Sequence, residues 1–138
     1  MTTPTENLAI VRRFFALITA RQLDLIPEVV AADYINHNPS PGQVPGGASV
    51  QHTLAMLHAT FDPMRFDCHE YIPAGDRVVA RFTIRGIHRQ PFLGVPATGK
   101  PIALDGVDIF RIAHGKIAEA WVVMDRYGFL QQTGALPA

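Results

Sequence analysis

Apolar residues in the first half of the chain recur at the three- and four-residue intervals of amphipathic helices. The first helix follows Thr3-Pro4-Thr5-Glu6, a capping box with proline at the first helical position. The pattern predicts a second, short helix over residues 24–32 and a third over residues 48–60. The buried stripes of the first and third helices are expected to be Leu8, Val11, Phe15 and Ile18, and Val50, Leu54, Leu57 and Phe61.

The second half of the chain changes to the two-residue alternation of strands. Strands are predicted over residues 66–72, 77–88, 102–112 and 117–125. Asp105-Gly106 is a competing hairpin signal, but the apolar alternation continues through it, so we expect a bulge or bend there. Helices followed by antiparallel hairpins predict an α+β fold, in which helices pack on one face of a curved sheet.

Three of these strands carry one polar group on an otherwise apolar face, namely His88, Asp108 and Asp125. An unpaired carboxylate is costly to bury, so it must be hydrogen-bonded, neutralised or used. Asp108 therefore either pairs with a neighbour such as Arg81 or Arg111, or lies in a pocket. Asp125 stands before RYGFLQQTG, a predicted short helix, and the residues alone favour an N-cap there.

Other polar and aromatic residues also have two readings. In the segment DYINHNP, Tyr34, Asn36 and His37 either shape an Asx-type turn or face a cavity. His88 either closes its strand or lies in the same cavity. Trp121 is expected in the core, although a wide aromatic ring also serves as a platform for ligands.

Length and composition narrow the classes of function. The 138 residues suffice for a single domain over residues 1–138, and 12 basic residues balance 12 acidic ones. The absence of a Lys/Arg cluster argues against nucleic acid as a partner. No apolar run reaches the length of a membrane span and no signal peptide is recognised, so we expect no membrane association and a cytoplasmic location. Cys68 is the single cysteine and excludes an internal disulfide.

The six histidines do not predict a metal site. None of them forms the i, i+4 pair on a helix that zinc hydrolases use. His52 and His58 are six residues apart on the third predicted helix and do not share a face. We therefore expect no metal.

Several segments resemble the SnoaL-like polyketide cyclases, or ester cyclases, of the nuclear-transport-factor-2-like superfamily. They are DYINHNP, FLGVPATGK, DGVDIFRI and the ending W-x-x-x-D, and the likeness extends over residues 5–134. The resemblance implies a cone-shaped α+β barrel, in which a curved antiparallel or mixed sheet wraps around three N-terminal helices and encloses an apolar cavity. Since this superfold hosts many functions, the resemblance specifies fold more closely than reaction.

The family's cyclases close a ring by an intramolecular aldol reaction without metal or organic cofactor, with an aspartate as general acid and base. The resemblance implies this role for Asp125, reversing the preference for a cap, with Asp108 as a second carboxyl group or an orienting group. The substrate would be a hydrophobic or polycyclic carbonyl compound. The residues expected to bind it are His37, Asn36, Tyr34, His88, Phe82, Phe110 and Trp121.

Two other functions stay open, an isomerase and a non-catalytic binding module, and a third, an epoxide hydrolase, is disfavoured. An isomerase would need a base and an oxyanion donor, which Asp125 with Asp108 or Tyr34 could supply. An epoxide hydrolase of this superfamily would need Arg-x-Asp on one strand, which the predicted strands lack. A non-catalytic small-molecule-binding module would have Asp125 exposed or fully paired and a small or filled cavity.

The resemblance also implies a homodimer. Antiparallel sheets with an apolar outer face often pair in this way. The strand faces opposite to those that carry His88, Asp108 and Asp125 are also apolar. They carry Val79, Ile87, Val107, Ile109 and Val122. These residues need a cover, which either helices or a second subunit would provide.

Overall fold

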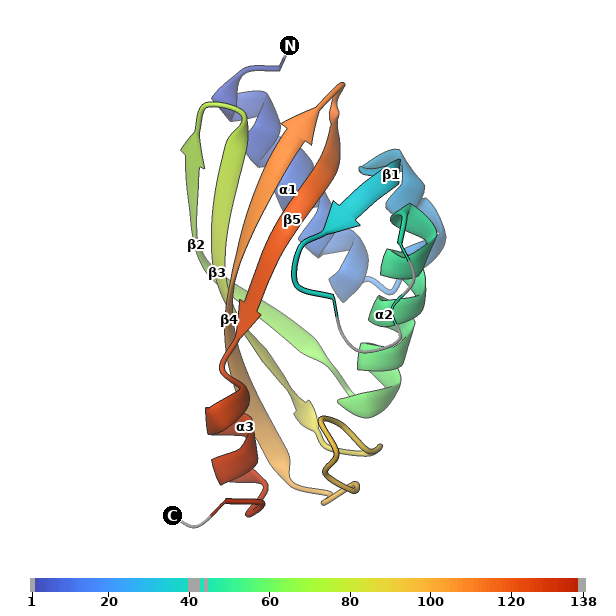
Figure 1. The fold of residues 1–138 in the computed structure, drawn as a ribbon, viewed down its shortest axis with the longest axis vertical. Coiled ribbons are helices and arrows are strands. Elements are labelled where there is room, and N and C mark those ends of the chain that lie inside the picture. Colours follow the sequence, from blue (N-terminus) through green and yellow to red (C-terminus); the bar gives the residue numbers. More distant parts are fainter. Residues whose placement is uncertain (1, 40–42, 44, 137–138) are drawn as a thin grey trace.

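The computed structural model describes residues 2–39, 43 and 45–136 of the chain (Figure 1). In chain order the elements are α1 (Pro4–Thr19), the 3₁₀ helix η1 (Leu23–Glu28), β1 (Val30–Asn36), α2 (Gly47–Thr60), β2 (Arg65–Ala74), β3 (Arg77–Ile87), β4 (Pro101–Ala113), β5 (Lys116–Met124) and α3 (Arg126–Gln132). The predicted α+β class is confirmed.

The five strands form one mixed sheet in the order β1-β5-β4-β3-β2. Strands β2 to β5 are antiparallel to their neighbours, whereas β1 lies parallel to β5 at one edge. Helix α1 packs against β2 and β3, and α2 packs against β1 and η1 (Figure 1). The curved sheet and the N-terminal helices thus form the expected cone.

Helix α1 begins as its sequence predicts. The Glu6 N–H donates to Thr3 Oγ1 at 3.2 Å, and the Thr3 N–H donates to Glu6 Oε2 at 3.3 Å, which completes the capping box. Val11, Phe15 and Ile18 are buried on its inner face. Among the helices of the described residues, none combines the length and the apolar character that a membrane crossing requires.

The segment after η1 is a strand, and the predicted helix over residues 24–32 is wrong beyond Glu28. The β-branched pair Val29 and Val30 favours extended backbone. Strand β1 is completed by a partner far along the chain, since the Ile117 N–H donates to the Val29 carbonyl at 2.8 Å. This parallel pairing brings the DYINHNP segment beside the end of β5.

The inner faces of β3 and β4 are as predicted, but the predicted face of β5 is wrong. Val122 lies opposite Asp108 in the antiparallel register, and directly opposed residues point to the same side. Val122 and Met124 therefore point inward, while Trp121 and Val123 point outward. Because β5 is apolar on both faces, its alternation alone does not identify the inner one.

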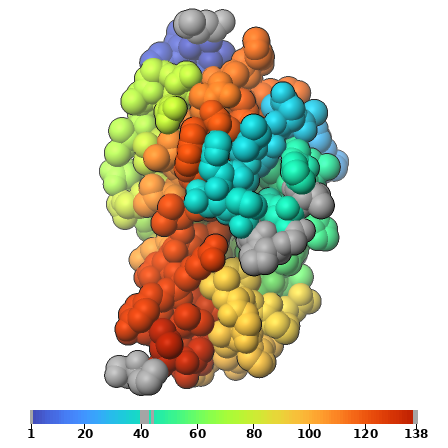
Figure 2. All heavy atoms as spheres, in the orientation of Figure 1, coloured from blue at the N-terminus to red at the C-terminus, as the bar shows by residue number. Residues whose placement is uncertain are grey.

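The far end of the cone is closed by aromatic packing. Phe61, Phe92 and Phe129 contact one another edge to face, with ring centroids 5.2 to 6.2 Å apart. In Figure 2 the loop over residues 88–100, in yellow, lies against α3, in red. These contacts hold the C-terminal helix and the Pro- and Gly-rich loop on the sheet.

Gly106 lies in an unbroken stretch of β4, so the bulge expected at Asp105-Gly106 is absent. Phe82 of β3 stands directly opposite Gly106 and places its ring over the glycine. A Cβ atom at position 106 would lie 2.5 Å from Phe82 Cζ. The glycine therefore makes room for the ring. The register shifts of the sheet lie elsewhere, between Val30 and Ile35, between Cys68 and Glu70, and between Arg111 and Ile112.

We predict that Gly106→Ala lowers the free energy of unfolding by roughly 1–3 kcal/mol, because the added methyl group overpacks the site under the Phe82 ring. Urea unfolding monitored by circular dichroism measures the change. The double variant Gly106→Ala, Phe82→Leu should recover part of the loss. A single variant as stable as the wild type would contradict the close packing of this pair.

Candidate active site

A cavity of about 110 Å³ opens between the inner face of the sheet and α1, α2 and β1; the space rises to about 770 Å³ when the solvent-filled mouth is included. Its apolar wall is formed by Phe14, Phe15, Ile18, Val50, Leu54, Leu57, Phe66, Phe82, Phe110, Val122 and Met124. The polar groups in the wall are Tyr34, Asn36, Asn38, Gln43, Thr53, Asp108 and Arg126. The cavity is therefore largely apolar with a few placed polar groups, as is usual for small-molecule sites.

Asp108 is the carboxyl group that projects into this cavity. Its side chain comes from the middle of β4 and is 7% exposed, and Oδ1 has no hydrogen-bond partner among the described residues. The two cations that could neutralise it are paired elsewhere, Arg81 with Glu70 at 2.7 Å and Arg111 with Glu119. Burial raises the pKa of Asp108 to about 8. Of the two readings of Asp108, the structure supports the pocket.

Tyr34 reaches the same cavity from β1 and is buried. Burial raises the pKa of its phenol far above the usual value, and the nearby charge of Asp108 adds to the increase. The phenol therefore stays protonated and remains a hydrogen-bond donor at neutral pH. A carboxyl group that titrates near neutrality and a permanent donor thus face one apolar space.

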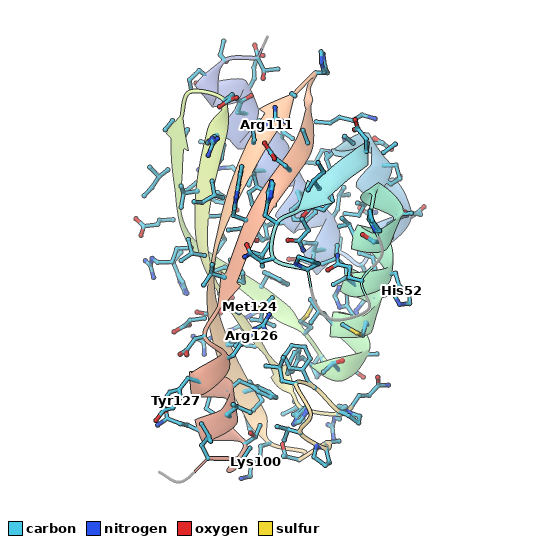
Figure 3. All side chains as sticks on the ribbon, in the orientation of Figure 1. His52, Lys100, Arg111, Met124, Arg126 and Tyr127 are labelled. Atoms are coloured by element: carbon cyan, nitrogen blue, oxygen red, sulfur yellow. The ribbon has the colours of Figure 1, made fainter. Side chains whose placement is uncertain are left out.

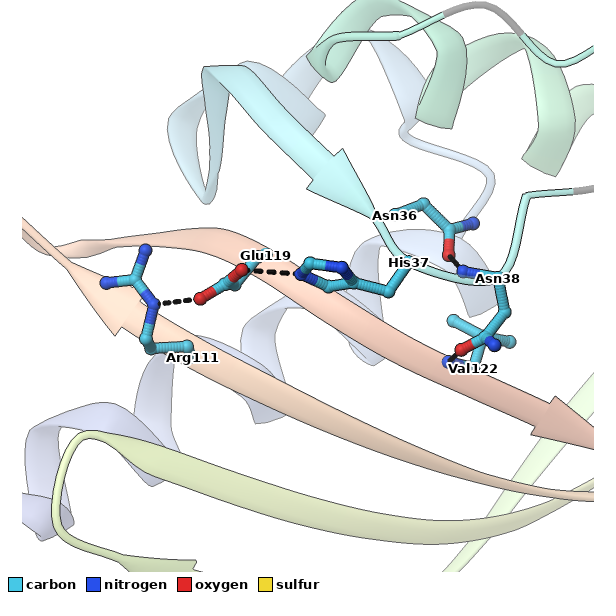
Figure 4. Close-up of polar contacts among 6 residues, drawn as sticks. All are labelled: Asn36, His37, Asn38, Arg111, Glu119 and Val122. Atoms are coloured by element: carbon cyan, nitrogen blue, oxygen red, sulfur yellow. Dashed lines mark hydrogen bonds and ion pairs between the residues drawn. The ribbon is translucent and has the colours of Figure 1, made fainter.

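The segment after β1 both turns the chain and lines the cavity. The Asn38 N–H donates to Asn36 Oδ1 at 2.9 Å, which is an Asx-type turn, and Asn36 Nδ2 donates to Gln43 Oε1 at 3.4 Å. Asn38 Oδ1 accepts from the Val122 N–H at 2.9 Å and ties the segment to β5 (Figure 4). Both readings of Asn36 therefore hold. Of the prolines that follow this turn, Pro39 is exposed and Pro41 lies outside the described residues.

His37 and Trp121 lie on the outer face of the sheet, so the structure does not place them in the cavity wall as expected. Their rings stack at a centroid distance of 4.4 Å. His37 Nε2 lies 2.6 Å from Glu119 Oε2, and Arg111 binds the other oxygen of that carboxylate (Figure 4). Hydrogen bonds from His37 and Arg111 lower the pKa of Glu119. Because Trp121 is on the outward-pointing side of β5, this cluster lies outside the cavity.

His88 is fully buried but is absent from the cavity wall, so the structure does not bring it to the cavity as expected. Its Nδ1 lies 3.0 Å from Thr98 Oγ1 and accepts from the Thr98 N–H at 3.3 Å. The ring packs beside Phe61 and Phe129. His88 thus anchors the loop over residues 88–100 at the far end of the cone.

Asp125 is exposed and lies outside the cavity wall, so its expected place in the cavity is wrong. Its Oδ1 accepts from the Gly128 N–H at 2.8 Å and caps α3. The N-cap that the residues alone favour is the arrangement found. The carboxylate borders a shallow groove on the outer side instead, together with Arg81 and Asp105.

Phe82 and Phe110 line the cavity as expected, whereas Arg126 is a wall residue that sequence reasoning missed. Arg126 begins α3 immediately after β5 and, together with Met124, lies at the lower end of that strand (Figure 3). A charged residue in the first turn of a short helix looks like an ordinary surface residue. Within the described part of the chain, no three His, Cys, Asp or Glu side chains gather as metal ligands would.

The raised pKa of Asp108 predicts a pH-dependent stability. Its pKa is higher in the folded state than the ordinary value of 3.8, so the folded protein binds the proton more tightly than the unfolded chain. This contribution to stability is complete below about pH 4 and is lost as the pH rises to about 8, at roughly 1 kcal/mol per pH unit. The Asp108→Asn variant lacks this titration.

Urea unfolding of wild type and Asp108→Asn at pH 5, 7 and 9 measures the effect. The variant should gain stability relative to the wild type by several kcal/mol between pH 5 and 9. Groups common to both proteins cancel in the difference. Parallel curves would show that Asp108 is paired or hydrated.

Comparison with known proteins agrees with this geometry. The family model described as SnoaL-like polyketide cyclase matches residues 9–133. The chain is 26% identical to aklanonic acid methyl ester cyclase DnrD of Streptomyces peucetius over 136 residues, which covers 94% of this chain and 92% of that protein.

Two solved structures show the same fold. TsrD from Streptomyces laurentii superposes with a TM-score of 0.89 at 25% identity, covering 99% of this chain and all of that one. IdmH, a putative polyketide cyclase from Streptomyces antibioticus, superposes with a TM-score of 0.76 at 26% identity, covering 96% of this chain and 99% of that one. The matched family model spans nearly the whole cone, and this chain belongs to the SnoaL-like polyketide cyclase family.

Proposed function

We propose that the protein is a cofactor-free acid–base enzyme that closes a ring in a hydrophobic carbonyl compound by an intramolecular aldol reaction. The observation that carries the proposal is the carboxyl group of Asp108, which lies buried in an apolar cavity without a counterion among the described residues. A carboxyl group with a pKa of about 8 exchanges protons near neutral pH, where an ordinary aspartate is a weak base.

The reaction requires one proton to leave and return. Ionised Asp108 removes a proton from a carbon flanked by carbonyl groups, which yields an enolate and a neutral Asp108. The enolate carbon attacks a second carbonyl of the same molecule, so a C–C bond forms and its oxygen becomes an alkoxide. Asp108 returns the proton to that oxygen, and the net change is an isomerisation.

Tyr34 and the aromatic wall would assist this sequence. The protonated phenol of Tyr34 donates a hydrogen bond to a carbonyl oxygen on which negative charge develops. Phe82 and Phe110 hold the flat substrate against α1 and exclude water. Holding both reacting carbons in one cavity supplies the orientation that an intramolecular addition needs.

We assign the acid–base role to Asp108 in place of Asp125. Asp125 is committed to the N-terminus of α3 and is exposed outside the cavity wall. An exposed carboxylate keeps its hydration shell and lies outside the space where a substrate would be held. Asp108 therefore fits the role that the family resemblance suggested for Asp125.

An isomerase that moves a proton between two carbons of one substrate is a second candidate. The observation that favours it is the shared cavity of Asp108 and Tyr34, which are a base and an oxyanion donor. A non-catalytic binding module agrees with the exposed Asp125, but it gives no reason for a carboxyl group buried in the cavity without a hydrogen-bond partner for Oδ1 among the described residues. Product analysis separates ring closure from isomerisation.

We predict that Asp108→Asn lowers kcat by about 10²–10⁴-fold, because the proton carrier is lost while shape is kept. The matched control Asp125→Asn removes a carboxylate outside the cavity and should keep kcat within about threefold, since asparagine also caps helices. Turnover of candidate β-dicarbonyl aromatic substrates, followed by absorbance, measures both.

The pH profile adds a second readout to this comparison. The value of kcat/KM should rise between pH 6 and 8 and level off above the pKa of Asp108, because only the ionised carboxylate takes the first proton. Full activity of Asp108→Asn, or loss of activity in Asp125→Asn alone, would refute the assignment.

We also propose that the outer face of the sheet forms a homodimer interface. Val107 and Val123 stand opposite each other on this face and are 39% and 63% exposed. The neighbouring pair Val79 and Ile109 is partly buried. An apolar centre on an antiparallel sheet suits a two-fold contact with a second copy. Val122, which was expected on this face, lines the cavity instead.

We predict that Val107→Lys yields a monomer, because two buried ammonium groups would meet near the two-fold axis without partners. Light scattering after size exclusion should give about twice the chain mass of 15.1 kDa for the wild type and that mass for the variant. Met56→Lys on α2 is a matched control, since Met56 is also 39% exposed. A monomeric wild type would exclude this interface.

A further inference from the structure

Arg126 is the cation of the cavity wall within the described residues: it is exposed, like its two neighbours, but unlike them it lines the cavity. Asp125 before it caps α3 on the outer side, and Tyr127 after it is 62% exposed. In Figure 3, Arg126 and Met124 lie on one side of the end of β5 and Tyr127 points away on the other. Backbone geometry at the start of α3 thus directs one guanidinium toward the cavity mouth.

The guanidinium of Arg126 has no ion-pair partner among the described residues. Seven other arginines of the described chain form ion pairs with Asp or Glu side chains. Of the other arginines, Arg12 lies over the Tyr71 ring and Arg89 donates to the Asp62 carbonyl, so among the described residues Arg126 is the arginine without such a contact, although it adjoins an aspartate in sequence. The Asp125 carboxylate is held by the Gly128 N–H, on the outer side. Five N–H donors at the mouth are therefore available to a ligand.

Arg126 does not act as a counterion for the carboxyl group of Asp108. A nearby cation would lower the pKa of that carboxyl group, whereas burial raises it to about 8. Val122, directly opposite Asp108, and Arg126 are four residues apart along β5 and its end, which corresponds to roughly 13 Å of extended chain. The cavity therefore has an acidic group in its middle and a cationic group at its mouth.

We propose that Arg126 binds a carboxylate of the substrate at the cavity mouth, so that the protein selects carbonyl compounds that carry a free acid at one end. The planar guanidinium accepts a carboxylate through two parallel hydrogen bonds, which fixes direction as well as position. Such an anchor places the opposite, apolar end of the substrate against Phe82 and Phe110 and its middle beside Asp108. This substrate class rests on the proposed function, but the binding preference does not.

Direct binding of a matched pair of probes tests the inference. Anthracene-2-carboxylate and anthracene-2-carboxamide have similar shapes and differ in charge, and titration calorimetry or probe fluorescence at pH 6 measures each Kd. At this pH Asp108 is protonated and the probe acid is ionised. We expect the wild type to bind the acid about tenfold more tightly than the amide, with the preference weakening as salt increases.

Three variants distinguish the contribution of Arg126 to the binding preference from the effect of removing any arginine. Arg126→Met should abolish the preference by weakening the acid alone, and Arg126→Lys should keep part of it. Arg13→Met removes an arginine that pairs with Glu28 on the outside and should leave the preference unchanged. Equal Kd values for both probes in the wild type, failure of the acid to bind, or a preference that survives in Arg126→Met would overturn the inference.

The outcome is independent of turnover. Asp108→Asn should retain the preference for the acid, because Asp108 is neutral at pH 6 in the wild type. A protein that prefers the acid but turns over no substrate would refute the proposed reaction alone. A protein that closes rings without any preference for acids would refute the role of Arg126 alone.

Discussion

The site depends on the cost of holding one carboxyl group away from water. Asp108 lies on the inner face of β4, and its cross-strand neighbours on that face, Ala80 of β3 and Val122 of β5, are both apolar. Two arginines are close in sequence or register, Arg81 on β3 and Arg111 on β4. They do not neutralise Asp108, because their side chains point outward to Glu70 and Glu119. The alternation of the strands thus separates cations from the carboxyl group by the thickness of the sheet. The same separation holds the proton on Asp108 at neutral pH.

The parallel pairing of β1 with β5 completes the space around this group. It brings Tyr34 into the wall and lets Asn38 bind the backbone of β5 at Val122, directly opposite Asp108 in the register. The edge strand therefore does more than extend the sheet, because it supplies the rim and a permanent hydrogen-bond donor. A segment between two helices becomes part of the site only through a partner more than eighty residues away.

Local rules predict the parts of this fold that depend on local signals. The capping box at Thr3, the four long strands and the inner faces of β3 and β4 follow from spacing and turn chemistry. Asp108 is recognisable because a carboxylate interrupts an apolar face. The family resemblance adds the cone, which periodicity alone does not specify.

The failures arise where tertiary pairing decides. Strand β1 has too short an apolar run to be distinguished from a helix. The face of β5 depends on its register with β4, so Trp121 and Asp125 are assigned to the wrong side. Arg126 has the character of a surface residue, and only the position of α3 at the end of β5 brings it to the cavity. His88 is recognisable as buried, but its partner Thr98 lies beyond an irregular loop.

The contact between Gly106 and Phe82 divides two tasks between neighbouring positions of one strand. Asp108 would carry out the proton transfer. Gly106, two residues before it, has no side chain and so determines how closely the Phe82 ring packs against β4. The width of the cavity can therefore change in evolution through substitutions of Phe82 and the other wall residues, while Asp108 stays in place. Such a layout lets one scaffold diversify in the ring systems it admits without rebuilding its reactive centre.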